Sequence, residues 1–141
     1  MSSAPPWAPL FFAISASSWV PHWSCHYYRL ETGSGFAVGS WSYTTADSVV
    51  ALAFYSALII ANLSATITTR VRMPVALLSG ALHLGFAALH FYRLYRPFRF
   101  EVFGYPWSLS ASLREAVILF VFGTLSIFLA MKMRQQKRPS N

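Results

Sequence analysis

The sequence contains few charged residues and very few acidic ones. Charged side chains make up only 11% of its 141 residues, with 11 Lys and Arg residues against four Asp and Glu residues. Soluble domains usually carry about 25% charged residues. Hydrophobic residues make up 55% of the chain. This composition excludes an ordinary soluble domain and predicts one integral membrane domain over residues 1–141.

Cysteines and catalytic motifs are scarce as well. Cys25 is the only cysteine, which excludes an intrachain disulfide and a cysteine-based zinc site. The sequence has no Gly-rich phosphate loop and no Ser-His-Asp set, so we expect a protein without catalytic activity. Residues 1–28 contain no charged side chain. Because a cleaved signal peptide begins with basic residues, the first apolar segment is expected to remain in the protein.

The apolar residues gather in four segments of the length that a bilayer requires. A membrane-spanning helix needs about 20 mainly apolar residues. We therefore predict an all-α fold of four transmembrane helices, over residues 10–28, 48–69, 73–92 and 112–131. The first segment is the weakest, because serines and histidines interrupt it and Pro21 predicts a kink. Such a helix is expected to pack against protein rather than lipid.

The segments between the apolar runs contain signals for helix starts. Thr44 followed by Asp47 indicates an N-cap before the second apolar segment. Ser112 followed by Glu115 has the pattern of a capping box, with Ser108 as an alternative start of the fourth helix. The remaining connections are predicted to be loops, at residues 30–43 and 93–107.

A five-residue motif occurs twice in the chain. The copies are His26-Tyr27-Tyr28-Arg29-Leu30 and His90-Phe91-Tyr92-Arg93-Leu94. When the chain is aligned with itself so that His26 matches His90, the ends of the apolar segments match as well. We call this shift in residue number the repeat offset. We interpret this as a duplicated two-helix hairpin, at about residues 8–70 and 72–134, with a basic tail at 132–141. Because each unit crosses the membrane twice, the two units point the same way and form a parallel repeat about a pseudo-twofold axis along the membrane normal.

The basic residues are unevenly placed at the ends of the predicted helices. Six of them share one side with no acidic residue: Arg70, Arg72, Lys132, Arg134, Lys137 and Arg138. The positive-inside rule then places both termini in the cytoplasm, and we expect a bacterial plasma or photosynthetic membrane. The net charge is +7, which would suggest nucleic acid in a soluble protein. At span ends it indicates anionic lipid headgroups and no nucleic acid.

All four histidines lie in the first and third apolar segments: His22, His26, His83 and His90. Imidazole is a common metal ligand, and polar groups inside membranes are often functional. His26 and His90 are equivalent in the repeat, so they could ligate the metal of haem b or (bacterio)chlorophyll, with His22 and His83 as further contacts. Arg29 and Arg93 could reach acidic groups of this ligand. Alternatively, the Tyr and Arg residues of the motif are membrane-interface anchors, which leaves only the histidines to explain.

These observations lead to three hypotheses for function. The first is a small non-catalytic subunit of an electron-transfer or photosynthetic complex, which binds other integral membrane subunits and a haem or chlorophyll-type pigment. The second is a ligand-free scaffold that binds lipids and partner helices. The third is a small transporter or channel that uses the interface between the repeats. The remaining charged residues lie at predicted helix starts or in loops, where solvated caps and ion pairs are favoured over a proton path. They are Asp47, Glu101, Arg114 and Glu115.

Overall fold

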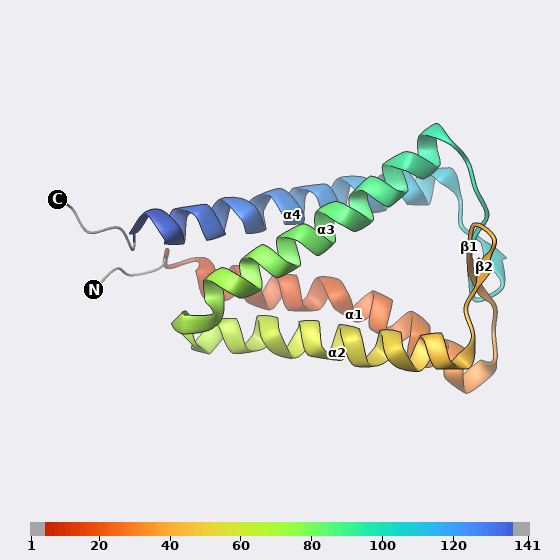
Figure 1. Ribbon diagram of the computed structural model, residues 1–141, viewed down its shortest axis with the longest axis horizontal. Coiled ribbons are helices and arrows are strands. Elements are labelled where there is room, and N and C mark those ends of the chain that lie inside the picture. The colour runs from red at the N-terminus through yellow and green to blue at the C-terminus, as the bar shows by residue number, and fades with distance from the viewer. Residues whose placement is uncertain (1–4, 137–141) are drawn as a thin grey trace.

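The computed structural model describes residues 5–136 and contains four helices and four short strands. Figure 1 shows two antiparallel helix pairs side by side, with the strands at one end and both termini at the other. We call these the sheet end and the terminal end. The first hairpin contains α1 (Ala8–Thr32), β1 (Phe36–Val38), β2 (Trp41–Ser42) and α2 (Thr45–Ile67). A 3-10 turn (Thr69–Val71) leads to the second hairpin, which contains α3 (Arg72–Tyr95), β3 (Phe100–Val102), β4 (Tyr105–Pro106) and α4 (Leu109–Gln136).

Three segments of the described chain are long and apolar enough to cross a membrane. They are Thr45–Ile67, Thr69–Tyr95 and Leu109–Gln135, so the prediction of a membrane protein with transmembrane helices is confirmed at this level. Helix α1 has 25 residues, a length of roughly 37 Å at 1.5 Å per residue. Because of its polar side chains, α1 is less apolar than the three segments named above.

The helix ends follow from local capping chemistry. The hydroxyl of Thr44 accepts a hydrogen bond from the backbone N–H of Asp47, and the Asp47 carboxylate accepts one from the backbone N–H of Thr44. This capping box confirms the predicted start of α2. Helix α1 ends at Gly33, whose φ of 68° is the left-handed conformation that favours glycine.

The predicted capping box at Ser112 is wrong. Helix α4 already begins at Leu109, and the hydroxyl of Ser108 accepts a hydrogen bond from the backbone N–H of Ala111. Ser112 is therefore inside the helix, where its hydroxyl is buried and accepts a hydrogen bond from Arg93. Glu115 consequently belongs to the second turn of α4 rather than to its cap.

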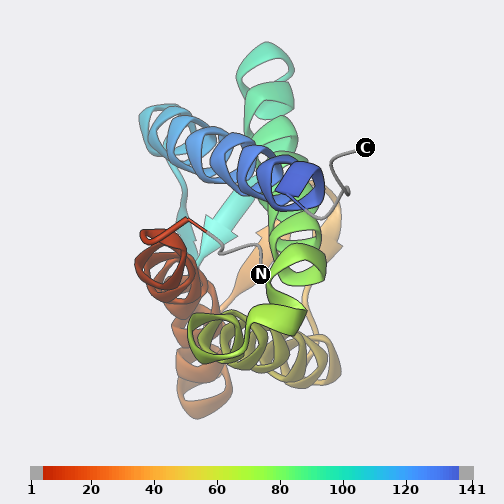
Figure 2. The ribbon, with the colours of Figure 1, turned by 90° about the vertical axis from the view of Figure 1, so that its left-hand side faces the viewer.

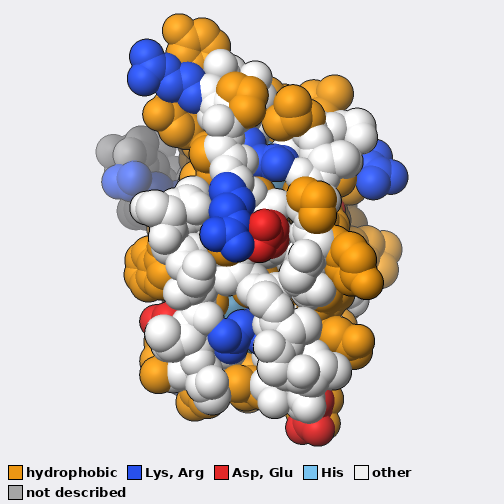
Figure 3. All heavy atoms as spheres, turned by 90° about the vertical axis from the view of Figure 1, so that its right-hand side faces the viewer, with side chains coloured by type: hydrophobic (Ala, Val, Ile, Leu, Met, Phe, Trp, Pro, Cys, Tyr) orange, Lys and Arg blue, Asp and Glu red, His pale blue; other side chains and the backbone are white. Residues whose placement is uncertain are grey.

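The structure has the four predicted helices, and the two predicted loops contain short strands that were not predicted. Their strands form one antiparallel sheet in the order β2-β1-β3-β4. In its centre Ala37 pairs with Glu101, flanked by Phe36 with Val102 and Val38 with Phe100. The strands have only two or three residues, too few to give an alternating sequence pattern. Figure 3 looks onto this end, where charged side chains lie both near the middle and at the edges, with hydrophobic side chains between them along the edges.

The helices pack most closely within each hairpin. α1 lies along α2, and α3 lies along α4, while α2 and α3 have a smaller contact. In the second hairpin small residues allow close approach of the helices: a Cβ added to Gly80 would lie 2.8 Å from Ile127, and one added to Gly123 would lie 2.6 Å from Leu84. Between the hairpins, the side-chain amide of Asn62 donates to the hydroxyl of Ser79.

Two apolar clusters join the hairpins. At the terminal end, residues of all four helices meet around Phe12, Val75 and Leu129. Nearer the sheet end, Trp19 packs with Tyr55 and Leu58, and Leu82 and Phe86 of α3 lie against them. Figure 2 shows the four helices end-on, with α1 and α4 on one side and α2 and α3 in contact on the other.

Equivalent elements of the two hairpins begin at positions separated by the repeat offset: α1 and α3, β1 and β3, β2 and β4, and α2 and α4. The same offset relates specific hydrogen bonds. Tyr43 donates its backbone N–H to the carbonyl of Phe36, and Trp107 donates its backbone N–H to the carbonyl of Phe100.

Candidate cavity between the hairpins

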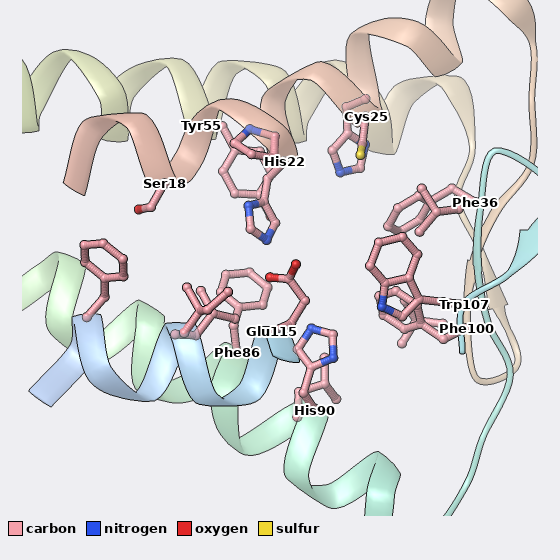
Figure 4. A pocket seen from close by; sticks show the side chains of 18 of the residues that line it. Ser18, His22, Cys25, Phe36, Tyr55, Phe86, His90, Phe100, Trp107 and Glu115 are labelled. Atoms are coloured by element: carbon pink, nitrogen blue, oxygen red, sulfur yellow. The ribbon is translucent and has the colours of Figure 1, made fainter. Parts of the chain in front are cut away.

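A cavity of about 500 Å³ lies between the two hairpins and beneath the sheet. This volume is within the usual range of small-molecule sites, roughly 300–1,000 Å³. Most of its wall is apolar and aromatic, including Phe36, Phe86, Phe100, Phe122 and Trp107. Its ionisable and nucleophilic lining residues are His22, Cys25, His26, Tyr43, Tyr55, His90 and Glu115. Figure 4 shows side chains from both hairpins pointing into this space.

The structure brings His26 and His90 to the same cavity, one from each hairpin. Both are buried, at 4% and 5% exposure. Nδ1 of His26 lies 3.3 Å from the hydroxyl of Ser48, an interaction that leaves Nε2 free. Nδ1 of His90 has no partner among the described residues. Each imidazole also packs against the phenylalanine that begins the central strand of its own hairpin, Phe36 or Phe100.

His22 lines the cavity from α1, and Glu115 lines it from α4. Figure 4 shows the Glu115 carboxyl group pointing into the space between the imidazoles of His22 and His90. No hydrogen bond or ion pair of Glu115 occurs within residues 5–136, where the ion pair found joins Arg99 to Glu101. The cavity lining therefore contains the carboxyl group of Glu115 together with imidazoles, and no arginine or lysine of the described residues lines it.

His83 does not belong to the cavity lining. It is fully buried, and its ring lies 4.2 Å from that of Trp19, centroid to centroid. Nδ1 is 2.7 Å from the carbonyl of Ser79, and Nε2 is 2.9 Å from the hydroxyl of Ser18. Because both ring nitrogens have partners, His83 has no free nitrogen for a ligand in this arrangement. It connects the two hairpins instead.

Arg29 and Arg93 are also outside the cavity lining. Arg29 donates to the carbonyls of Tyr43 and Thr44 and to the hydroxyl of Ser48. Arg93 makes the corresponding bonds in the second hairpin, to Trp107, Ser108 and Ser112. Each guanidinium group thus ties the end of one helix to the start of the next, and these donors are already used within the protein.

The lining residues that the sequence did not mark as site candidates include Cys25, Trp107 and Glu115. The indole N–H of Trp107 is buried and has no partner among the described residues, so it is available to a hydrogen-bond acceptor in the cavity. Tyr43 also lines the cavity, and burial, with the Asp47 carboxylate as a smaller cause, raises the pKa of its phenol. Glu115 could have been found from the repeat, because its counterpart in the first hairpin is Ala51.

No group of three or more His, Cys, Asp or Glu side chains that could hold a metal ion is found within residues 5–136. Comparison with protein-family models, with curated proteins and with solved structures gives no match for this chain.

Proposed function

We propose that this chain is a small, non-catalytic subunit of a larger membrane complex, and that it holds a haem- or chlorophyll-type macrocycle between its hairpins. His26 and His90 are its proposed metal ligands. The observation that carries the proposal is that these two equivalent histidines, one from each hairpin, line a single cavity with aromatic walls. Such a ligand supplies its own metal, so the protein needs to provide only one or two axial imidazoles.

The proposed architecture is four spans built from two tandem hairpins about a pseudo-twofold axis. Three features support it: the constant offset between equivalent elements, the matching hydrogen bonds of Arg29 and Arg93, and the register of the central strands. In that register Ala37 pairs with Glu101, which is its own equivalent in the second hairpin. A pairing of this kind is what a twofold axis through the sheet requires.

Helix α1 is the proposed fourth span despite its polar residues. Several of these side chains find partners inside the protein rather than facing lipid. Ser18 bonds His83 of α3, and the indole of Trp23 donates to Ser56 of α2. These bonds remove much of the penalty for polar groups in a membrane.

The surroundings of the two histidines favour axial ligation. The Ser48 hydroxyl at Nδ1 of His26 is the kind of outer contact that fixes an imidazole and leaves Nε2 for a metal. His90 is buried with an unpartnered nitrogen, which a free protein should avoid unless a ligand satisfies it. The proposal assigns His22 to the wall beside the ligand. It assigns Arg29, Arg93 and His83 to the scaffold.

The test is absorption spectroscopy of the purified protein, as isolated and during titration with haemin. The expected result is a Soret band of a six-coordinate, two-histidine haem, or a pigment band in the isolated protein. His26→Ala and His90→Ala should each convert the band to that of a singly ligated haem and weaken binding. The double variant should bind no haem specifically.

His83→Gln is the matched control, because it removes a buried histidine of α3 that does not line the cavity. It should keep the spectrum of the parent protein. Circular dichroism of each variant establishes that it is folded. A folded parent protein without pigment that gives no saturable Soret shift with haemin would contradict the proposal, as would an unchanged spectrum in both alanine variants. For the complex, affinity purification from the native membrane and mass spectrometry should identify stoichiometric membrane partners.

A further inference from the structure

The cavity is closed at both of its ends along the helix axes. Toward the sheet end, Phe36, Val38, Phe100, Val102 and Trp107 form its roof. Toward the terminal end, the buried cluster around Phe12 and Leu129 joins all four helices. These two groups of residues cover the cavity at the two ends of the described structure.

The side formed by α2 and α3 is closed as well. Leu82 and Phe86 of α3 pack against the cluster of Trp19, Tyr55 and Leu58. The hydrogen bond from the Asn62 amide to the Ser79 hydroxyl joins the same two helices. Only Tyr55 of α2 reaches the cavity lining.

The side formed by α1 and α4 is different. These two helices provide more of the cavity lining than α2 and α3, yet no hydrogen bond links their described residues and their backbones are not closely packed. Ile14 of α1 and Ile118 of α4 both line the cavity, and their side chains are 46% and 48% exposed. Ser17 and Pro21 combine cavity lining and surface exposure in the same way. Side chains that face both the cavity and the surface define an opening.

We infer that the cavity opens sideways into the bilayer through a portal between α1 and α4, and that its ligand enters from the hydrocarbon phase. The portal is the gap bordered by Ile14, Ser17 and Pro21 of α1 and by Ile118 of α4. These residues lie within the helices, away from the sheet and away from the termini. An opening at this depth faces lipid chains rather than water.

The lining defines the chemical class of the ligand. A portal without charged residues excludes a free ionic solute and admits a lipid-soluble molecule with an extended apolar or aromatic body. Inside, the Trp107 N–H, the imidazoles and the Glu115 carboxyl group offer hydrogen bonds to one polar group or metal centre of that molecule. This inference rests on the proposed function in one respect, because a membrane-dissolved macrocycle is one member of this class.

The experiment uses Cys25, the only cysteine, which lines the cavity and is half-buried. The full-length protein is reconstituted in phosphatidylcholine nanodiscs, where both aqueous faces are accessible. It is treated either with lipid-soluble N-cyclohexylmaleimide or with a charged methanethiosulfonate. Mass spectrometry follows the addition of one label. The expected result is that the maleimide labels Cys25 and that the charged reagent labels it much more slowly; Cys25→Ser should take up neither.

The repeat supplies matched controls for the portal. Ile14→Trp and Ile118→Trp should slow maleimide labelling severalfold, because an indole at either position fills the opening. Leu78→Trp and Phe54→Trp change the equivalent positions on the closed side, which are 51% and 41% exposed. These two variants should label at the rate of the parent protein.

Three outcomes would overturn the portal. They are equal labelling by the charged reagent, no labelling of folded parent protein by the maleimide, and equal slowing by tryptophan on both sides. None of these measurements uses haem. If haem does not bind but Cys25 labelling follows the expected pattern, the macrocycle is rejected and the portal is kept. If haem binds but the labelling pattern fails, the portal is rejected and the macrocycle is kept.

Discussion

Trp19 and His83 lie ring against ring across the interface of the two hairpins, with centroids 4.2 Å apart, and they are equivalent positions under the repeat offset. His22 and Phe86, also equivalent, meet in the same way at 5.8 Å. Each hairpin thus supplies an aromatic ring where the other supplies an imidazole. This exchange positions α1 against α3 and keeps His83 out of the cavity that His22 lines.

The bond between Ser18 and His83 should contribute measurably to stability. Ser18→Ala leaves Nε2 of the fully buried His83 without its partner. We expect the free energy of unfolding in detergent to fall by about 1 kcal/mol. Ser17→Ala is the control, because the Ser17 hydroxyl only bonds the carbonyl of Ala13 in its own helix. A Ser18→Ala protein no less stable than Ser17→Ala would argue against this contact.

The two repeat arginines should differ in their importance. Both guanidinium groups make three equivalent bonds, but Nε of Arg93 also donates to the carbonyl of Phe98, whereas Nε of Arg29 has no partner among the described residues. Lysine cannot reproduce such a multiple contact. Arg93→Lys should therefore lower the free energy of unfolding by roughly 1 kcal/mol more than Arg29→Lys. Equal losses in chemical denaturation would show that the additional bond is unimportant.

Glycines at the contact of α3 and α4 can be tested against one that faces open space. In Gly123→Ala the new Cβ would lie 2.6 Å from Cγ of Leu84, and in Gly80→Ala it would lie 2.8 Å from Ile127. Both variants should lose about 1–3 kcal/mol of stability through overpacking. Gly85→Ala meets nothing within 4 Å and should be neutral or slightly stabilising, because alanine favours a helix. The comparison requires only thermal unfolding of the three variants.

The ion pair on the sheet makes a prediction about pH. The hydrogen bond from Arg99 holds the pKa of Glu101 below its ordinary value of 4.5. A carboxyl group with a lowered pKa in the folded state adds stability above its unfolded pKa. That stability is lost as the pH falls through the folded pKa. NMR titration of Glu101 should give a midpoint below 4.5, and Arg99→Gln should move it upward; an unchanged midpoint would mean that the pair does not persist in solution.

Much of the helical part of the fold could be predicted from the sequence, because long apolar runs determine it directly. The apolar segment at residues 73–92 became α3, which extends it from Arg72 to Tyr95. The capping box at Thr44 was recognisable because both partners are close in sequence. The sheet was missed because its pairs depend on contacts such as that of Ala37 with Glu101, which no local pattern reports.

The site could be predicted only in part. His26 and His90 were found because the repeat marks them, and His22 because it shares a helical face with His26. His83 was assigned to the same site, although its contacts depend on Ser18 of the other hairpin. Glu115 was missed because its apparent capping box with Ser112 placed it in solvent. Because Ser108 caps α4 instead, Glu115 lies in the second turn of the helix, and its side chain points into the cavity.

The central pairing of β1 with β3 has a consequence for biosynthesis. Most helix contacts are local to one hairpin, so α1 and α2 can associate as soon as both have left the ribosome. The pairing of Phe36 with Val102 must wait until α2, α3 and β3 have also been synthesised. The central pair of the sheet therefore forms later than the contact of α1 with α2, and the cavity is complete only when α4 has added its share of the lining.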